Sequence, residues 1–190
     1  KLGFDACEFE DFEEVNLGTG KIKAIPFLGE HADLHIRSKT AWYFELGGKK
    51  MFAGADSSSL DEHLYARVHE KIGDLDMLFI GMECVGAPMS WLYGALFTKP
   101  IPRAINESRR FNGSDFVSAR KLVHIFKPKS VYIYALGMEP WFKYFMGVEY
   151  SEDSRQIQES TLLMNHCALL DIQSEQLFSR REWHFQLPRP

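Results

Sequence analysis

The stretch TAWYFELGGKKMFAGAD, residues Thr40–Asp56, carries the clearest structural signal in the chain. Its two runs, Thr40–Leu46 and Lys49–Ala55, are rich in aromatic and apolar residues, which is typical of β-strands. A Gly-Gly dipeptide joins them, and glycine tolerates the positive φ that a tight hairpin turn needs. The stretch therefore predicts an antiparallel hairpin whose second strand runs directly into an acidic residue, Asp56.

Helix-like and strand-like patterns alternate around this hairpin. Ser59 and Glu62 form a capping-box pattern, apolar residues then recur at every fourth position, and Gly73 follows as a stop signal. Two further helices are expected, one starting near Ser114 and one within Glu159–Leu170. Three further strands are expected at Lys21–Phe27, Asp76–Met82 and Ser130–Leu136.

This order of elements predicts an α/β fold in which a mixed sheet is flanked by helices. The stretch Glu83–Phe111 is rich in glycine, proline and aromatic residues and has weak periodicity, so we predict a long functional excursion there. The sequence shows no internal repeat, low-complexity tract or linker. We therefore expect a single domain over residues 1–190.

Composition argues against several classes of protein. Hydrophobic residues make up 45% of the chain and charged residues 25%, as in ordinary globular proteins. A net charge of −4 argues against a basic nucleic-acid face. No apolar run is long enough to cross a membrane and no signal peptide is visible, so we expect a cytoplasmic protein. Three widely spaced cysteines without a C-x-x-C pattern are expected to be buried free thiols: Cys7, Cys84 and Cys167.

Two acidic residues are candidate metal ligands, because each follows a predicted strand. Glu30 comes after Lys21–Phe27, and Asp56 ends the hairpin. In open α/β sheets ligands gather at strand ends, and carboxylate oxygens bind hard or borderline metals. Gly29 and Gly54 beside them would let the backbone come close. The alternative is that both are solvated loop residues, where Asp and Glu are ordinarily found.

The segment HADLH, residues 31–35, is a rival metal site. In an extended segment His31, Asp33 and His35 share a face, and in a helix His31 and His35 share one. Either arrangement would form part of a zinc site. The remaining histidines are expected in solvent or in ordinary structural roles: His63, His69, His124, His166 and His184.

A second group of residues is predicted to bind a small-molecule substrate. Arg109 and Arg110 come shortly before the helix start at Ser114, where paired guanidiniums would hold a carboxylate or phosphate. Intramolecular salt bridges are the alternative for this pair. Glu83 ends a predicted strand and faces the same edge as Asp56. The stretch from Trp91 to Pro102 would wall the pocket, and Met138–Trp141 would close the same edge.

Four segments in this order, IPFLGEHADL, MFAGADSS, DMLFIGMEC and VYIYALGMEP, resemble the C-terminal half of a metallo-β-lactamase-fold domain. The resemblance implies an αββα-type sandwich with a dinuclear metal centre of iron or zinc. Asp56 matches the position of the aspartate that bridges the two metals. Glu30 matches the preceding ligand, which is usually a histidine. The separation of 26 residues (56 − 30) and the glutamate in place of histidine both resemble one branch of the family. That branch includes the di-iron β-hydroxylase of chloramphenicol biosynthesis.

The chain departs from this family at its defining motif, H-x-H-x-D-H. No two of the seven histidines are separated by one residue, so the motif and its four ligands are absent. The usual final histidine, after the strand Ser130–Leu136, is absent as well. The sequence thus predicts the second half of a two-half fold, truncated or naturally split, and catalytically incomplete alone.

Half of such a sandwich would leave one apolar sheet face uncovered, and a patch of that size needs a partner. We expect self-association into a homo-oligomer or docking of an N-terminal half-domain, and the fifteen phenylalanines fit either. Two functions stay open. The chain is either part of a metal-dependent oxygenase or hydrolase, or a non-catalytic, self-associating binding module without metal.

Overall fold

The computed structural model describes residues 3–27, 39–55, 57, 61–82, 90, 94–106, 114–141, 144 and 150–185. The strands in this part of the chain are β1 (Glu14–Asn16), β2 (Gly20–Pro26), β3 (Thr40–Leu46), β4 (Lys49–Ala53), β5 (Met77–Gly81), β6 (Ser130–Tyr134) and β7 (Gln173–Gln176). The helices are α1 (Glu62–Ile72), η1 (Gly94–Leu96), α3 (Arg103–Asn106), α4 (Phe116–Phe126) and α6 (Arg155–Leu169).

The strands form one seven-stranded sheet in the order β1-β2-β3-β4-β5-β6-β7. Strands β1 to β4 pair antiparallel, whereas β4 to β7 pair parallel. Parallel neighbours need a crossover, and helices α1, α4 and α6 lie within the three crossovers. The predicted mixed α/β sheet flanked by helices is therefore confirmed.

The predicted hairpin is confirmed, although its second strand ends at Ala53 and not at Ala55. Leu46 pairs with Lys49, so Gly47 and Gly48 are the two turn residues. Their φ angles are 58° and 71°, in the left-handed region that favours glycine. Two successive positive φ angles match the twist of the flanking strands.

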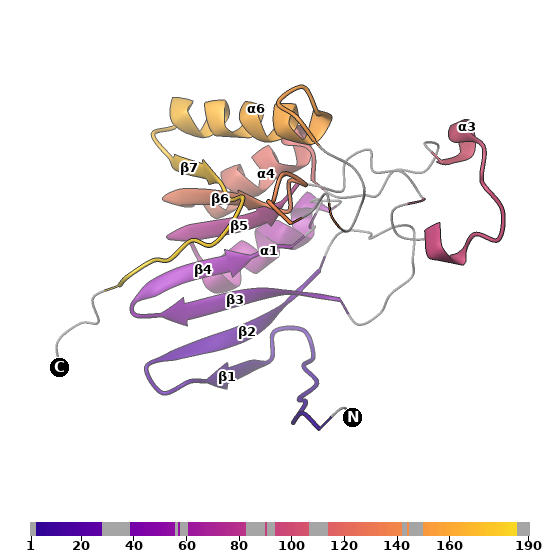
Figure 1. Ribbon diagram of the computed structural model, residues 1–190. Coiled ribbons are helices and arrows are strands. Elements are labelled where there is room, and N and C mark those ends of the chain that lie inside the picture. Colours follow the sequence, from indigo (N-terminus) through magenta and orange to yellow (C-terminus); the bar gives the residue numbers. More distant parts are fainter. Residues whose placement is uncertain are drawn as a thin grey trace.

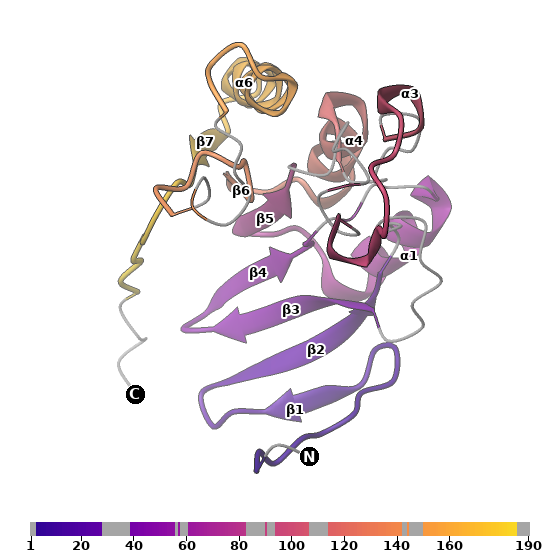
Figure 2. The ribbon, with the colours of Figure 1, turned by 45° about the vertical axis from the view of Figure 1, so that its right-hand side comes forward.

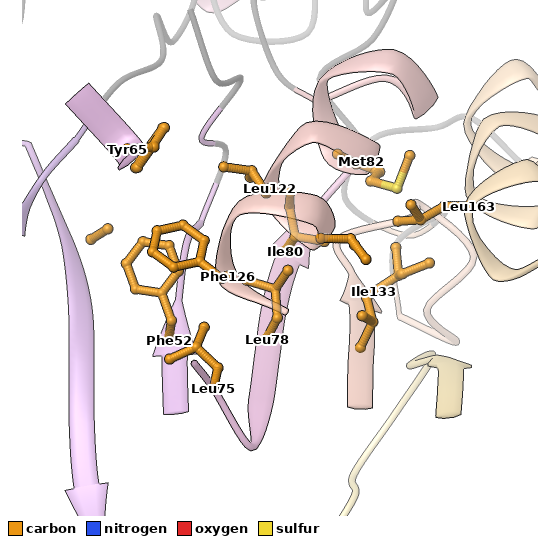
Figure 3. Packing of buried hydrophobic residues seen from close by; sticks show 14 of the residues in the cluster. Phe52, Tyr65, Leu75, Leu78, Ile80, Met82, Leu122, Phe126, Ile133 and Leu163 are labelled. Carbon is orange, nitrogen blue, oxygen red and sulfur yellow. The ribbon is translucent and has the colours of Figure 1, made fainter. Parts of the chain in front are cut away.

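Helices α1, α4 and α6 pack along one face of the sheet, where they form the core (Figures 1 and 2). Its aromatic centre consists of Phe52 from β4, Tyr65 from α1 and Phe126 from α4, all fully buried. The Phe52 ring lies 5.1 Å from the Phe126 ring and 6.4 Å from the Tyr65 ring (Figure 3). Each such side chain contributes roughly 1.5–3 kcal/mol by burial, so these contacts fix α1 and α4 on the sheet.

The helix boundaries correct two predictions. The N-cap of α1 is Asp61 and not Ser59, because the Asp61 carboxylate accepts hydrogen bonds from the backbone N–H groups of His63 and Leu64. Helix α6 begins at Arg155, before the expected Glu159. The stop at Gly73 is confirmed, with a φ of 74°.

Two strands were not predicted, because neither has an apolar pattern. Strand β1 has only three residues, all exposed. Strand β7 has the sequence QSEQ, which reads as part of a polar tail. Its polarity is compensated locally, since Gln176 Nε2 donates to Ser160 Oγ of α6 at 2.7 Å.

Two further expectations about single residues are wrong. Cys7 is exposed and not buried, because it lies in the irregular segment before β1. His69 was expected in solvent, but its Nε2 lies 2.7 Å from Asp74 Oδ1 and its ring packs on Phe126. The expected burial of Cys167 is confirmed.

The sheet face away from the helices is also apolar, and we call it the outer face. Because side chains alternate along a strand, the neighbours of the core residues point to this side. It carries half-buried side chains from β2 to β6: Ile22, Trp42, Phe44, Met51, Phe79 and Tyr132. A sheet face of this composition is suited to packing against another layer.

The two ends of the described chain shield part of the outer face. Near the N-terminus, Phe9 packs edge-on against Trp42 at 5.4 Å. The segment after β7 runs along the same side of the sheet (Figure 2), and Trp183 contacts Phe79 and Tyr132.

Every helix among the described residues is too short or too polar to span a lipid bilayer.

A polar cluster at Asp76 stabilises the opposite end of the parallel strands. The Asp76 carboxylate accepts from the Lys50 backbone N–H at 2.9 Å and from Lys129 Nζ at 2.7 Å. Burial alone would raise the pKa of Asp76, but the hydrogen bonds from Lys129 and Lys50 outweigh it and lower the pKa. A carboxyl whose pKa is lowered by folding stabilises the fold above its unfolded pKa, and loses this effect as pH falls through the folded value.

We predict that Asp76→Asn lowers the free energy of unfolding by about 1–2 kcal/mol at pH 7, because charged hydrogen bonds are weakened. The difference from the wild type should shrink in acid, where Asp76 is protonated in both states. Urea denaturation at pH 7 and in acid measures both effects. Glu70→Gln, which removes the exposed ion pair with Arg67, is the control and should change little. An equal loss at both pH values would contradict the assignment.

Candidate functional site

The strands that precede the predicted ligands end at one edge of the sheet, which we call the carboxyl edge. Strands β2 and β4 both run antiparallel to β3 and therefore run parallel to each other. At this edge Pro26 pairs with Thr40 and Ala53 pairs with Trp42. Strands β5 and β6 run in the same direction as β4, and α3 lies beyond their ends (Figure 1). Glu30 follows β2 in the chain and Asp56 follows β4, so the segments that contain them both start from this edge.

All the site residues predicted from the sequence lie outside the described residues: Glu30, His31, His35, Asp56, Glu83, Trp91, Arg109 and Arg110. Their roles remain predictions. Within the described ranges, no group of three or more His, Cys, Asp or Glu side chains is arranged to hold a metal ion.

The backbone on both sides of position 56 is held firmly. Beyond the end of β4, the Gly54 N–H donates to the Phe79 carbonyl, and the Gly81 N–H donates to the Ala55 carbonyl, both at 2.8 Å. Ser57 is fully buried, and its backbone N–H donates to the Gly54 carbonyl at 3.0 Å. The residue before position 56 is therefore bonded to β5, and the residue after it is bonded to the end of β4.

Gly54 serves a different purpose from the one expected. A Cβ atom there would lie 3.3 Å from the Phe79 carbonyl oxygen and 3.5 Å from the Phe52 ring. The glycine thus allows close approach of the neighbouring strand. The turn that follows is tight, since Ala55 has a φ of 46°.

The start of α4 is tied to the same turn. The Ser114 hydroxyl donates to the Ser57 carbonyl, and both serines are fully buried. Asp115 then caps α4, because its carboxylate accepts from the Ser118 N–H at 2.8 Å. The helix start expected near Ser114 is thereby confirmed, and it lies at the carboxyl edge.

Sequence reasoning missed one acidic side chain at this edge. After β6, Glu139 Oε1 accepts from the Leu136 N–H at 3.1 Å. Its Oε2 is buried and has no hydrogen-bond partner among the described residues. The stretch Met138–Trp141 was expected to close this edge, and its glutamate was the available signal. The residue lines a pocket together with Tyr134, Ala135, Pro140, Trp141, Leu177, Ser179 and Arg180.

Comparison with known proteins gives one strong relative. The chain is 43% identical over 182 residues to the 4-amino-L-phenylalanyl-[CmlP-peptidyl-carrier-protein] 3-hydroxylase of Streptomyces venezuelae, a match that spans 95% of this chain and 34% of the relative. The crystal structure of CmlA, a diiron β-hydroxylase from Streptomyces venezuelae, superposes with a TM-score of 0.81 at 43% identity, over 94% of this chain and 34% of that one. No family model matches the chain.

A distant structure supports the fold alone. The metallo-β-lactamase fold protein YhfI from Bacillus subtilis matches with a TM-score of 0.50 at 7% identity, over 93% of this chain and 54% of that one. Together these matches confirm the resemblance to the metallo-β-lactamase fold and to the di-iron β-hydroxylase branch. The chain is homologous to the C-terminal part of the hydroxylase and spans about a third of its length.

We predict that Ser114→Ala lowers the free energy of unfolding by about 1–2 kcal/mol, because the buried Ser57 carbonyl loses a hydrogen bond. Ser118→Ala lies within α4, outside the Ser57–Ser114 link, and is the control. Its free energy of unfolding should stay within about 0.5 kcal/mol of the wild-type value. Urea denaturation compares the two variants with the wild type. Equal stabilities for all three proteins would show that the link does not hold α4 to the turn after β4.

Proposed function

We propose that the chain is the C-terminal part of a dinuclear-metal oxygenase of the metallo-β-lactamase fold, with Glu30 and Asp56 as two of its metal ligands. The observation that carries this proposal is the homology to the diiron hydroxylase over nearly the whole chain. The topology agrees with it, because the strands before both carboxylates end at the carboxyl edge.

Iron is the metal that we propose, since the relative is a diiron enzyme. Glutamate and aspartate supply oxygen donors, which suit iron and leave zinc as the alternative. When bound, a pair of iron ions would activate molecular oxygen for the reaction. This chain's own part would be to supply Asp56 from the segment after β4, where Gly54 and Ala55 are bonded to β5, and Glu30 from the segment after β2.

The proposed centre needs donors from outside this chain. Two carboxylates cannot fill the first coordination shell of metals that take four to six donors. The sequence lacks the H-x-H-x-D-H motif that would supply four more. We therefore propose that the chain is catalytically incomplete alone and that an N-terminal half-domain supplies the remaining ligands.

The outer face is the proposed docking surface for that half-domain. Its side chains are apolar and half-buried, and Phe9 and Trp183 contact only some of those described. Two sheets of a sandwich pack about 10 Å apart with interdigitating side chains. A second sheet packed on the outer face would bring its own strand ends to the carboxyl edge.

The proposed substrate is an aromatic aminoacyl group held on a carrier protein, as in the name of the relative. Hydroxylation would take place at its C3 atom. Glu83, Trp91, Arg109 and Arg110 are proposed to line the pocket between the two halves. The start of α4, tied to the turn after β4, would place the two arginines near this pocket.

We predict that Glu30→Ala combined with Asp56→Ala removes most of the bound iron from the complex with an N-terminal half. The preceding two-thirds of the Streptomyces venezuelae relative can serve as that half. Elemental analysis of the purified complex measures iron per protein. His31→Ala combined with His35→Ala is the matched control and should leave the iron content unchanged. An iron content equal to that of the wild-type complex in the Glu30/Asp56 variant would contradict their assignment as ligands.

We also predict that Phe44→Glu abolishes co-purification with the N-terminal half, because a charge would be buried on the outer face. Leu162→Glu places the same charge on the exposed side of α6 and should leave the complex intact. Light scattering of each purified chain tests the alternative of a self-associating module. A wild-type chain that forms homo-oligomers and does not bind the N-terminal half would favour that alternative.

A further inference from the structure

Two histidines outside the candidate site lie tip to tip on the helical layer. His124 is in the last turn of α4 and His166 is in the last turn of α6. Their Nε2 atoms are 3.1 Å apart, and their ring centroids are 5.1 Å apart. From the sequence both were expected to have ordinary structural roles, and the proposed function uses neither.

We propose that His124 and His166 together bind a transition-metal ion of the zinc class, at a site separate from the carboxyl edge. The site is separate because α4 begins at the carboxyl edge, where Ser114 meets Ser57, and His124 lies at its other end. Imidazole nitrogen is a preferred ligand of zinc, copper and nickel ions.

The distance between the two nitrogens fits shared coordination. Zinc–nitrogen bonds of about 2.0–2.1 Å at a tetrahedral angle hold two ligand nitrogens about 3.3 Å apart. The 3.1 Å separation is within a few tenths of an ångström of this value. An ion could therefore be bound with very little movement of α4 against α6.

Two opposing electrostatic effects act on a cation at this place. Both histidines lie in the last turn of a helix, where the negative end of the helix dipole and free carbonyl groups attract positive charge. Arg120 is the opposing charge, and its guanidinium lies over the Phe116 ring at 5.4 Å.

The site is open and has two protein ligands. His124 is exposed and His166 is half-buried, so an ion can enter from solvent. The described residues offer no third His, Cys, Asp or Glu ligand, and water would complete the shell. Such an ion would join α4 to α6, the outermost helix of the layer, and would stabilise their contact.

Calorimetric titration of the whole chain with Zn²⁺ tests the site. It is performed in the Glu30→Ala/Asp56→Ala background, so that the carboxyl edge cannot contribute. We expect one bound ion, with an affinity that falls at least tenfold in His124→Ala and in His166→Ala. His63→Ala removes an exposed histidine of α1 and should bind like the parent. Absence of binding by the parent, or unchanged binding in either site variant, would overturn the proposal.

A spectroscopic measurement separates ligation from a structural effect of the substitutions. The parent loaded with Cu²⁺ should show an electron paramagnetic resonance spectrum with coupling to two imidazole nitrogens. Each single variant should lose one of them, while far-UV circular dichroism in the presence of a chelator stays unchanged. A two-nitrogen spectrum that survives both substitutions would place the ion elsewhere and refute the site.

Discussion

The parallel pairing of β4 with β5 is the constraint on which the carboxyl edge depends. It continues past the end of β4, through the bonds from Gly54 to Phe79 and from Gly81 to Ala55. This continuation forces a tight turn, buries Ser57 and gives Ser114 a carbonyl to bind. A neighbouring strand and a helix start therefore anchor the residues on both sides of position 56, and the metal ligand proposed there would need such rigidity.

The two faces of the sheet differ, because helices cover one of them and the other carries half-buried apolar side chains. Phe52, Tyr65 and Phe126 fill the space between the sheet and the helices. Strands β3 and β5 place Trp42, Phe44 and Phe79 on the outer face, where a second sheet would suit them. The match to about a third of a larger hydroxylase is consistent with the proposed second half.

Local patterns predicted most of the fold, because its central strands and helices have clear signals. The hairpin, β5, β6 and the stop of α1 at Gly73 follow from glycine placement and apolar runs. Strands β1 and β7 could not be predicted from local patterns, because their residues are mostly polar. They form strands through pairing with β2 and β6. For the site, the sequence named Glu30 and Asp56 by spacing and family resemblance, and the structure adds the shared edge of their strands. Glu139 was not predicted, because it stands out only by a buried oxygen without a hydrogen-bond partner in the described part of the chain. The His124–His166 pair was not predicted, because it arises from contact between helices that are distant in the sequence.

In the proposed function, two carboxylates of this chain and the ligands of a second half share one metal centre at the carboxyl edge. X-ray diffraction from crystals of the complex, recorded on both sides of the iron absorption edge, locates the metal directly. We expect two anomalous peaks a few ångströms apart, in contact with Glu30 and Asp56 and facing the half that covers the outer face. Iron bound entirely within the other half, or an outer face left uncovered in the complex, would contradict it.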